Sequence, residues 1–247
     1  MRALITGASS GIGKEMALYL AEQDIDLVLV ARDKDRLKEV QNMIKTKSEI
    51  ICIDLSDIES CIELYKQVGD IDILINNAGF GKCGDFSEID LGTELNMIAT
   101  NVCSLHTLTK LFLTDMKKKN SGYILNVASI AGFLPGPKMA TYHATKSYVL
   151  SLTEGIYEEL EQDGYDVKIS ALCPGPIKTP FLETANVKFS NKPMSARYVA
   201  RYAIDNMFKG KYMIIPGGSN KAIRFLSKIV PDKFAGKIVY KSVDKRH

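Results

Sequence analysis

The sequence contains no long apolar run and no cysteine pair at metal-binding spacing. None of its apolar runs reaches the roughly 18 residues typical of a membrane-spanning helix. The five cysteines are odd in number and scattered, at Cys52, Cys61, Cys83, Cys103 and Cys173. This pattern fits neither a zinc site nor a disulfide framework and is typical of reduced thiols in a cytoplasm. We therefore expect no metal site and a cytoplasmic location.

The chain also lacks internal repeats, low-complexity tracts and any linker rich in Pro, Gly and Ser. Met1 leads directly into the first apolar run, so we expect no signal peptide. The 247 residues are 46% hydrophobic and 25% charged, which is ordinary for a globular protein with ample material for one core. We therefore predict a single domain over residues 1–247.

The net charge of +3 conceals a basic C-terminal segment. From Lys209 onward there are ten Lys or Arg residues against Asp232 and Asp244, a local excess of eight positive charges. The preceding 208 residues therefore carry a net charge of −5. No nucleic-acid recognition motif accompanies the basic segment, so we expect no nucleic-acid partner.

Short apolar runs alternate with helical patterns along the chain. The runs are nearly continuous in apolar residues, as in strands buried on both faces of a parallel sheet. They occupy residues 2–6, 27–31, 50–53, 71–75, 123–128, 167–173 and 212–215. The helical patterns occupy residues 12–23, 34–46, 57–67, 91–118, 143–162 and 195–208. This alternation predicts an α/β fold of the Rossmann type, a doubly wound parallel sheet of about seven strands with helices on both faces.

A glycine-rich turn follows the first apolar run. It reads Thr-Gly-Ala-Ser-Ser-Gly-Ile-Gly and leads into an amphipathic helix pattern. Glycines permit a tight turn and a close approach to a pyrophosphate, and the helix N-terminus adds unpaired N–H groups and partial positive charge. At the start of a βαβ unit this turn predicts a dinucleotide phosphate site. Its residues are Gly7, Ser9, Ser10, Gly11, Ile12 and Gly13.

Tyr142 and Lys146 stand four residues apart on a predicted helix, and Ser129 precedes Tyr142 by thirteen residues. The four-residue spacing places the Tyr and Lys side chains on one helix face. An isolated Tyr-x-x-x-Lys is usually no more than part of an amphipathic helix. A nearby lysine cation favours a phenolate, so we expect Lys146 to lower the pKa of Tyr142 from its usual value near ~10.

These elements occur in one order across nearly the whole chain, and that order resembles the short-chain dehydrogenase/reductase superfamily, specifically its short single-domain branch. The matching elements are the glycine turn, Asn76-Asn77-Ala78-Gly79, Asn101, Ser129, Tyr142-x-x-x-Lys146 and Pro174-Gly175. The resemblance covers roughly residues 1–216. It implies an oxidoreductase that reduces a carbonyl group to an alcohol with hydride from a nicotinamide cofactor.

The resemblance also implies roles for individual residues. Tyr142 would be the general acid/base, and Ser129 would hydrogen-bond the carbonyl oxygen of the substrate. Lys146 would lower the Tyr142 pKa and hold the nicotinamide ribose. Asn101 would position a water molecule in a proton relay. Beyond the glycine turn, the implied cofactor contacts are Asp54 and Leu55 at the adenine, Asn77, Ala78 and Gly79 near the adenosine ribose, and Pro174, Gly175, Ile177 and Thr179 at the nicotinamide.

The cofactor preference depends on the end of the second apolar run. An acid there would hydrogen-bond the ribose 2′-hydroxyl of NAD, whereas an arginine pairs with the 2′-phosphate of NADP. Counting from Gly13 puts Ala31 at the position of the acid and Arg32 next to it, with Asp33 as the competing position. We predict NADP(H), bound through Arg32, with NAD(H) as the alternative.

Two segments without a motif are expected to select the substrate. Phe133, Leu134, Met139, Phe181 and Leu182 would line an apolar pocket suited to a lipophilic ketone, aldehyde or 3-oxoacyl group. The alternative is that these loop side chains pack only on one another.

Residues 217–247 form a basic amphipathic extension. It departs from ketoacyl-carrier-protein reductases, in which a short C-terminal segment locks a tetramer. Apolar residues spaced by three and four predict an amphipathic helix that ends at Pro231. The extension would cover the protein's own core, form a dimer contact or substrate lid, or rest on an anionic membrane surface. We expect a homodimer or homotetramer that binds a small-molecule substrate.

Two other functions are compatible with parts of the sequence. A non-catalytic NADP-binding regulatory module would keep the fold, but the complete set of Ser129, Tyr142 and Lys146 favours an enzyme. A sugar-nucleotide epimerase or dehydratase shares Tyr-x-x-x-Lys, yet such chains have another glycine spacing and a substantial C-terminal substrate domain.

Overall fold

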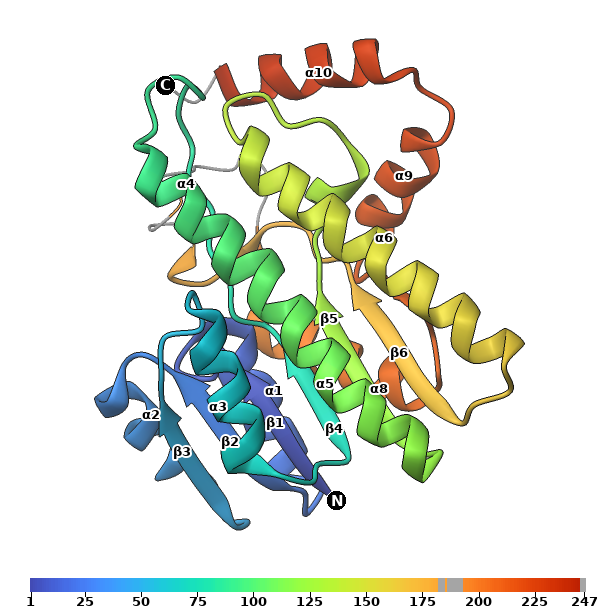
Figure 1. Cartoon of the computed structure of the whole chain (residues 1–247). Helices are drawn as coiled ribbons and strands as arrows, with labels where there is room; N and C mark the ends of the chain where they lie inside the picture. Colours follow the sequence, from blue (N-terminus) through green and yellow to red (C-terminus); the bar gives the residue numbers. More distant parts are fainter. Residues whose placement is uncertain (182–184, 186–192, 245–247) are drawn as a thin grey trace.

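A parallel sheet lies between two layers of helices in the computed structural model, which describes residues 1–181, 185 and 193–244 (Figure 1). The sheet has seven strands in the order β3-β2-β1-β4-β5-β6-β9, and every neighbouring pair is parallel. The strands are β1 Arg2–Thr6, β2 Asp26–Ala31, β3 Ser48–Cys52, β4 Ile73–Asn76, β5 Gly122–Val127, β6 Val167–Leu172 and β9 Met213–Ile214. The predicted doubly wound sheet is confirmed. Its strand order reverses between β1 and β4, where such folds bind their ligands.

Both faces of the sheet are covered, which explains the continuous apolar runs of the strands. One face packs against α1 (Gly11–Ala21), α2 (Lys34–Gln41) and α8 (Ala196–Phe208), and the other against α3 (Ile58–Val68), α5 (Ser104–Lys119) and α6 (Ala140–Gln162). In β1, Ala3 and Ile5 face the first layer while Leu4 faces the second, because successive side chains of a strand alternate. A central strand such as β1 therefore has no polar face.

Aspartates begin three of the helices. The carboxylates of Asp33, Asp57 and Asp90 accept backbone N–H bonds at the starts of α2, α3 and α4 (Leu91–Ile98). Such caps satisfy N–H groups that the first helical turn leaves without a partner. They also place the preceding loops at the carboxyl edge of the sheet.

The long helix predicted over residues 91–118 is interrupted. It consists of α4, a π-helical turn η1 (Ala99–Cys103) and α5, with helical dihedral angles throughout. The π-helical turn was not predicted, because a single extra residue within a long helical pattern carries no residue signal of its own. Two further short elements were not predicted. They are the 3₁₀ turn η2 (Ile130–Phe133) and the two-stranded sheet of β7 (Ile177–Lys178) and β8 (Met194–Ser195).

The C-terminal extension contains two helices rather than one. The predicted helix is α9 (Gly218–Ser227), and after Pro231 the chain forms a second helix, α10 (Asp232–Asp244). Both lie beyond the carboxyl edge of the sheet, at the top of Figure 1. Across residues 1–181, 185 and 193–244, no helix is long and apolar enough to cross a membrane.

Candidate active site

A cavity of about 930 Å³ lies along the carboxyl ends of the strands. It extends from Arg32 after β2, past the glycine turn, to Tyr142 on α6 and Thr179 after β7. All of the predicted site residues line it except Gly13 and Asn101. Predicted residues from seven segments of the sequence therefore meet in one cavity.

The glycine turn is shaped by positive backbone angles and close packing. Gly7 and Gly11 have φ angles of +65° and +56°, which favour glycine. A Cβ atom on Gly13 would lie 2.4 Å from the carbonyl oxygen of Gly7, so Gly13 allows α1 to pack against the turn rather than lining the cavity. Ser10, the N-cap of α1, makes no side-chain cap bond and the first turn holds no acidic residue. The first N–H groups of α1 thus fit a bound phosphate group.

Asn77 joins the glycine turn to the loop after β4. Its Nδ2 atom donates to the carbonyl oxygens of Thr6 at 2.9 Å and Gly7 at 3.1 Å. The Thr6 hydroxyl accepts hydrogen bonds in return from the backbone N–H groups of Asn77 and Ala78, at 2.9 and 3.0 Å. These four bonds fix the two loops at the point where strand order reverses.

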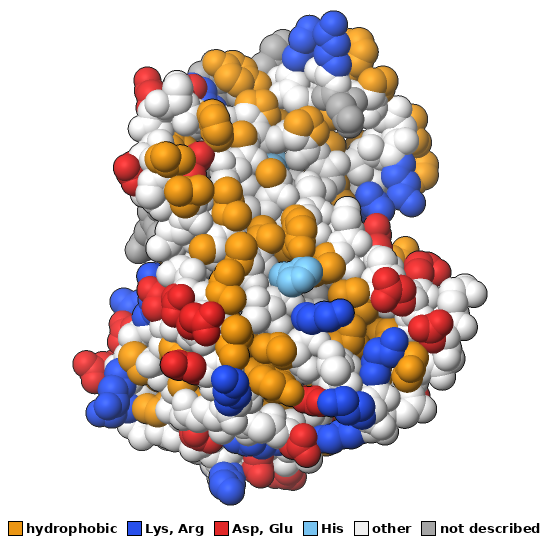
Figure 2. Space-filling model, in the orientation of Figure 1, with side chains coloured by type: hydrophobic (Ala, Val, Ile, Leu, Met, Phe, Trp, Pro, Cys, Tyr) orange, Lys and Arg blue, Asp and Glu red, His pale blue; other side chains and the backbone are white. Residues whose placement is uncertain are grey.

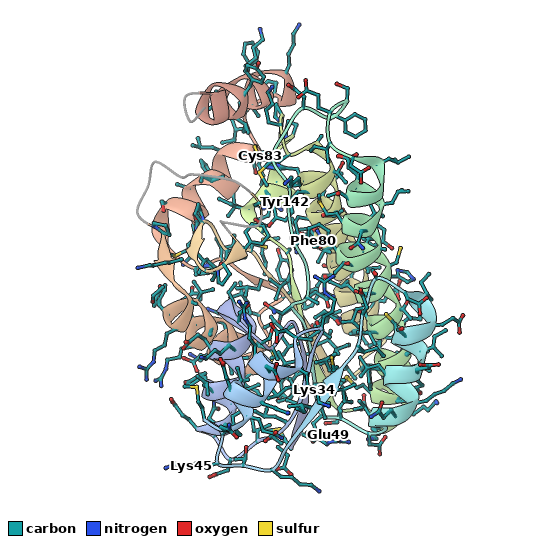
Figure 3. The ribbon with its side chains drawn as sticks, turned by 90° about the vertical axis from the view of Figure 1, so that its left-hand side faces the viewer. Lys34, Lys45, Glu49, Phe80, Cys83 and Tyr142 are labelled. Carbon is teal, nitrogen blue, oxygen red and sulfur yellow. The ribbon has the colours of Figure 1, made fainter. Side chains whose placement is uncertain are left out.

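Ser129, Tyr142 and Lys146 meet at the other end of the cavity. Ser129 follows β5, whereas Tyr142 and Lys146 share one face of α6, and all three side chains are at least nine-tenths buried. The Ser129 hydroxyl donates to the Pro174 carbonyl oxygen at 3.4 Å, and it lies close enough to the Tyr142 phenol to lower the pKa of that group. Figure 3 shows Tyr142 and Phe80 together in the upper half of the molecule, and the two residues belong to one apolar cluster.

Burial sets the protonation of the tyrosine and the lysine. Desolvation raises the pKa of Tyr142 to about 12, and the hydrogen bond from Ser129 opposes part of this rise. Desolvation lowers the pKa of Lys146 to about 8. The expectation that Lys146 lowers the Tyr142 pKa is wrong for this arrangement. The lysine amine donates instead to the Val127 carbonyl oxygen at 2.7 Å, and burial dominates at the phenol.

Asn101 lies in the π-helical turn behind the cavity wall. Its Nδ2 atom donates to the Phe80 carbonyl oxygen at 2.9 Å and the Thr145 hydroxyl at 3.1 Å, and its Oδ1 atom accepts from the Phe80 N–H at 3.0 Å. The side chain is 1% exposed. It therefore ties the loop after β4 to α6, one residue before Lys146. Its role in a proton relay stays a prediction.

Two arginines line the end of the cavity that lies farthest from Tyr142, after β2. Arg32 lies 3.7 Å from the Asp54 carboxylate, and Arg36, on the first turn of α2, also lines the cavity. Asp33, the competing cofactor residue, caps α2 through the Arg36 N–H at 3.0 Å and pairs with the Arg36 guanidinium at 3.4 Å. Arg36 was not among the cofactor contacts predicted from the sequence, because it lies on the same side as Arg32 only once α2 has formed.

The apolar end of the cavity agrees only partly with the sequence prediction. Leu134, Met139 and Phe181 line it as predicted, but Phe133 does not, because it packs under the Arg224 guanidinium at 4.7 Å from the ring centre. Leu182 lies outside the described residues. The cavity also receives lining residues that were not predicted, including Phe80, His143, Asn220, Ile238 and Val239.

His143 and Asn220 hold loops around this end. The His143 ring bonds to the Leu134 carbonyl oxygen through Nδ1 at 2.8 Å, and burial lowers the His143 pKa, so the ring is neutral at pH 7. Asn220, on the first turn of α9, donates to the Pro216 carbonyl oxygen at 2.7 Å. A Cβ atom on Gly175 would lie 2.5 Å from its Oδ1 atom, so the extension packs directly on the predicted nicotinamide loop.

Comparisons with known proteins agree with this site. The short chain dehydrogenase family model matches residues 1–188. An uncharacterized oxidoreductase of Staphylococcus epidermidis is 32% identical over 185 residues, which cover 73% of this chain and 80% of that protein. A short-chain dehydrogenase from Sphingobium yanoikuyae in complex with NADPH is 28% identical over 93% of this chain and 96% of that one, with a TM-score of 0.81.

A second solved structure carries the other cofactor. It is a short chain dehydrogenase/reductase from Burkholderia phymatum in complex with NAD, 26% identical, covering 91% of this chain and 92% of that one, with a TM-score of 0.82. The chain belongs to the short-chain dehydrogenase/reductase family. It is an oxidoreductase of that family with a nicotinamide nucleotide as its cofactor.

Proposed function

We propose that the protein is an NADP(H)-dependent reductase that converts a lipophilic ketone, aldehyde or 3-oxoacyl group to an alcohol. One observation carries the proposal. The buried hydroxyls of Ser129 and Tyr142 meet beside Lys146, in a cavity whose opposite end holds Arg32 and Arg36. A dinucleotide suits this length of cavity, with its phosphates at α1 and its nicotinamide near Tyr142.

The bound nicotinamide supplies the hydride, and the chain supplies the proton. Tyr142 keeps its proton at neutral pH because burial holds its pKa at about 12. It therefore suits the role of proton donor to a carbonyl oxygen that becomes an alkoxide. Ser129 donates a second hydrogen bond to the same oxygen and stabilises its developing charge. The Lys146 amine, with a pKa of about 8, returns a proton to Tyr142 after each turnover.

The arginines support NADP(H) over NAD(H). Both guanidinium groups line the cavity within the loop where a 2′-phosphate would lie, and paired arginines bind phosphate strongly. The Asp33 carboxylate, which would suit a 2′-hydroxyl, already accepts the N-terminal hydrogen bond of α2. Charge and hydrogen bonding at this end thus favour the phosphate.

Apolar side chains support a lipophilic substrate. Phe80, Leu134, Met139, Phe181 and Ile238 surround the space in front of Tyr142. Such a lining favours an alkyl or aryl chain beside the carbonyl group. Apart from Lys146 beside Tyr142, the residues described there offer no charged side chain to recognise an acid or a sugar phosphate.

An activity panel tests the proposal. Oxidation of NADPH and NADH would be followed with 3-oxoacyl thioesters, ketosteroids, aliphatic aldehydes and diketones. We expect turnover of the lipophilic carbonyls with NADPH, and its loss in the Tyr142→Phe variant. Tight NADPH binding without turnover of any carbonyl would instead support a non-catalytic regulatory module.

We also propose assembly as a homodimer or homotetramer in the cytoplasm. Exposed apolar side chains of α4, Leu91, Leu95 and Ile98, continue toward Tyr148 on α6, and Figure 2 shows apolar side chains running down this face. A second copy would cover them. The odd number and scatter of the cysteines support a reducing compartment. Sedimentation velocity would test the assembly, and a monomer at all concentrations would contradict it.

A further inference from the structure

The outer sides of α9 and α10 carry large exposed apolar side chains. Phe225 and Leu226 on α9 are 65% and 53% exposed, Ile229 just after α9 is 63% exposed, and Phe234 and Ile238 on α10 are 59% and 64% exposed. These five side chains are here called the tail patch. Phe234 and Ile238 are four residues apart and so share one side of α10, while Phe225, Leu226 and Ile229 lie together at the C-terminal end of α9. Single exposed apolar residues are ordinary, whereas such a group on consecutive helices marks a binding surface.

Lysines flank the tail patch on both helices. Lys221 on α9, Lys228 at its C-terminal cap, and Lys233 and Lys237 on α10 are exposed. No ion pair among the described residues includes any of these four lysines. Figure 2 shows Lys and Arg side chains next to apolar ones at the top of the molecule, where α10 lies. The surface is thus both apolar and positively charged.

The inner sides of the two helices are held against the rest of the protein. The Arg224 guanidinium stacks on Phe133 and lies 3.7 Å from Glu154. On α10, Ala235 is 4% exposed, and the Lys138 amine lies 6.0 Å from the centre of the Tyr240 ring. The five side chains of the tail patch, in contrast, are each more than half exposed.

The positive charge of this surface distinguishes between two possible partners, a second copy of the chain and an anionic lipid surface. A symmetric contact with a second copy would bring the lysines of both copies together, since such an interface pairs a surface with itself. Anionic lipid satisfies both features, because apolar side chains enter the boundary of the acyl region while lysines contact the headgroups. We propose that the tail patch docks the protein on an anionic lipid bilayer.

Docking would place the mouth of the cavity at the lipid surface. Ile238 belongs to the tail patch and also lines the cavity, and its neighbour Val239 lines the cavity too. A docked molecule therefore receives lipophilic carbonyl compounds from the boundary between lipid and water. This last step rests on the proposed function, whereas the docking itself does not.

Vesicle flotation tests the docking with the full-length protein. The vesicles would contain phosphatidylcholine with or without phosphatidylserine. We expect flotation with the anionic vesicles at low salt and its loss at high salt. The Lys228→Glu/Lys233→Glu variant should bind at least about tenfold more weakly, because it removes two favourable lysine contacts with the headgroups and replaces each with a repelled charge.

Further variants test whether the binding depends on the tail patch itself. Phe225→Ser/Leu226→Ser should also reduce flotation, whereas Lys45→Glu/Lys47→Glu, an equal charge change on exposed lysines, should leave it unchanged. Figure 3 places Lys45 at the opposite end of the molecule. Thermal unfolding of each variant would check folding, and the lysine variant removes no apolar contact.

Three results would overturn the proposal. The first is no flotation of the unaltered protein, and the second is flotation that neither tail variant reduces. The third is a concentration-dependent dimer that Phe225→Ser/Leu226→Ser disrupts without any lipid binding, which would assign the surface to a second copy. Flotation without turnover of any carbonyl would leave the docking supported and refute only the proposed function.

Discussion

The Lys146 amine lies 5.8 Å from the centre of the Tyr142 ring and donates a 2.7 Å hydrogen bond to the Val127 carbonyl oxygen. Burial shifts the two groups in opposite directions, raising the tyrosine pKa to about 12 and lowering the lysine pKa to about 8. Both shifts favour the uncharged form. Tyr142 therefore keeps its proton at neutral pH, whereas Lys146 releases its proton close to neutral pH.

Replacing Tyr142 with phenylalanine removes the hydroxyl and keeps the ring. We expect a fall in kcat of roughly 10²- to 10⁴-fold, the range typical of a lost general acid, with NADPH affinity within a few-fold of the original. Stopped-flow NADPH oxidation and fluorescence titration would measure the two quantities. Tyr148→Phe is the matched control, since Tyr148 lies on the same helix and is 39% exposed. Equal losses in the two variants would contradict the assignment.

Replacing Lys146 with methionine should stabilise the protein at neutral pH. The folded-state pKa of about 8 lies below the ordinary 10.5, so the unfolded chain binds more protons between these values. The contribution of Lys146 to the free energy of unfolding therefore rises with pH across that window, and below it the buried charge costs about 3 kcal/mol. The lost bond to Val127 offsets about 1 kcal/mol of the gain.

Urea unfolding at pH 7 and pH 10 would check this. We expect Lys146→Met to be more stable than the original protein by about 2 kcal/mol at pH 7 and to lose that advantage toward pH 10. The variant should also lose most of its activity. A stability difference that is the same at both pH values would show that Lys146 is not desolvated as described.

Replacing Arg32 with alanine should raise the KM for NADPH and leave that for NADH nearly unchanged. A charge-assisted hydrogen bond contributes about 1.5–3 kcal/mol, so the expected rise is roughly tenfold to 100-fold. Arg36→Ala should act in the same direction. Lys34→Ala is the control, because Lys34 is an exposed cation between the two arginines that does not line the cavity. An unchanged KM for NADPH in Arg32→Ala would assign the preference elsewhere.

Replacing Arg224 with alanine should loosen α9 from η2. The guanidinium stacks on Phe133 at 4.7 Å and lies 3.7 Å from Glu154, and the stacking alone contributes about 1 kcal/mol. We expect a higher KM for the carbonyl substrate with an unchanged KM for NADPH. Steady-state kinetics with each substrate varied in turn would measure the two KM values separately. Arg197→Ala, which removes an exposed arginine on α8, should change neither constant.

Local sequence was sufficient to predict most of the fold. The strands were predictable because Leu4 and its neighbours are buried on both faces, which leaves a continuous apolar run. The glycine turn, Ser129 and the Tyr142–Lys146 pair were predictable because each depends on a fixed spacing within one loop or one helix. These features need no knowledge of distant contacts.

Features that depend on distant contacts were not predictable. Ile238 and Val239 line the cavity only because α10 folds back over it after Pro231, and Phe133 is withdrawn from it by Arg224, which lies far along the chain. The Tyr142 pKa was misjudged for the same reason. Spacing places Lys146 on the correct face, but only the packed structure determines how much water the phenol loses.

The π-helical turn at residues 99–103 fixes the phase of the longest helical segment. It holds one extra residue, so the apolar pattern in the sequence of α5 is shifted by one position, about 100° of helix rotation, from that of α4, while both helices keep a buried face. Deleting one residue there would relax the turn to an ordinary helix in which α4 and α5 keep their buried faces, while Asn101 would move away from Phe80 and Thr145. The extra residue thus serves the placement of Asn101 rather than the packing of α5.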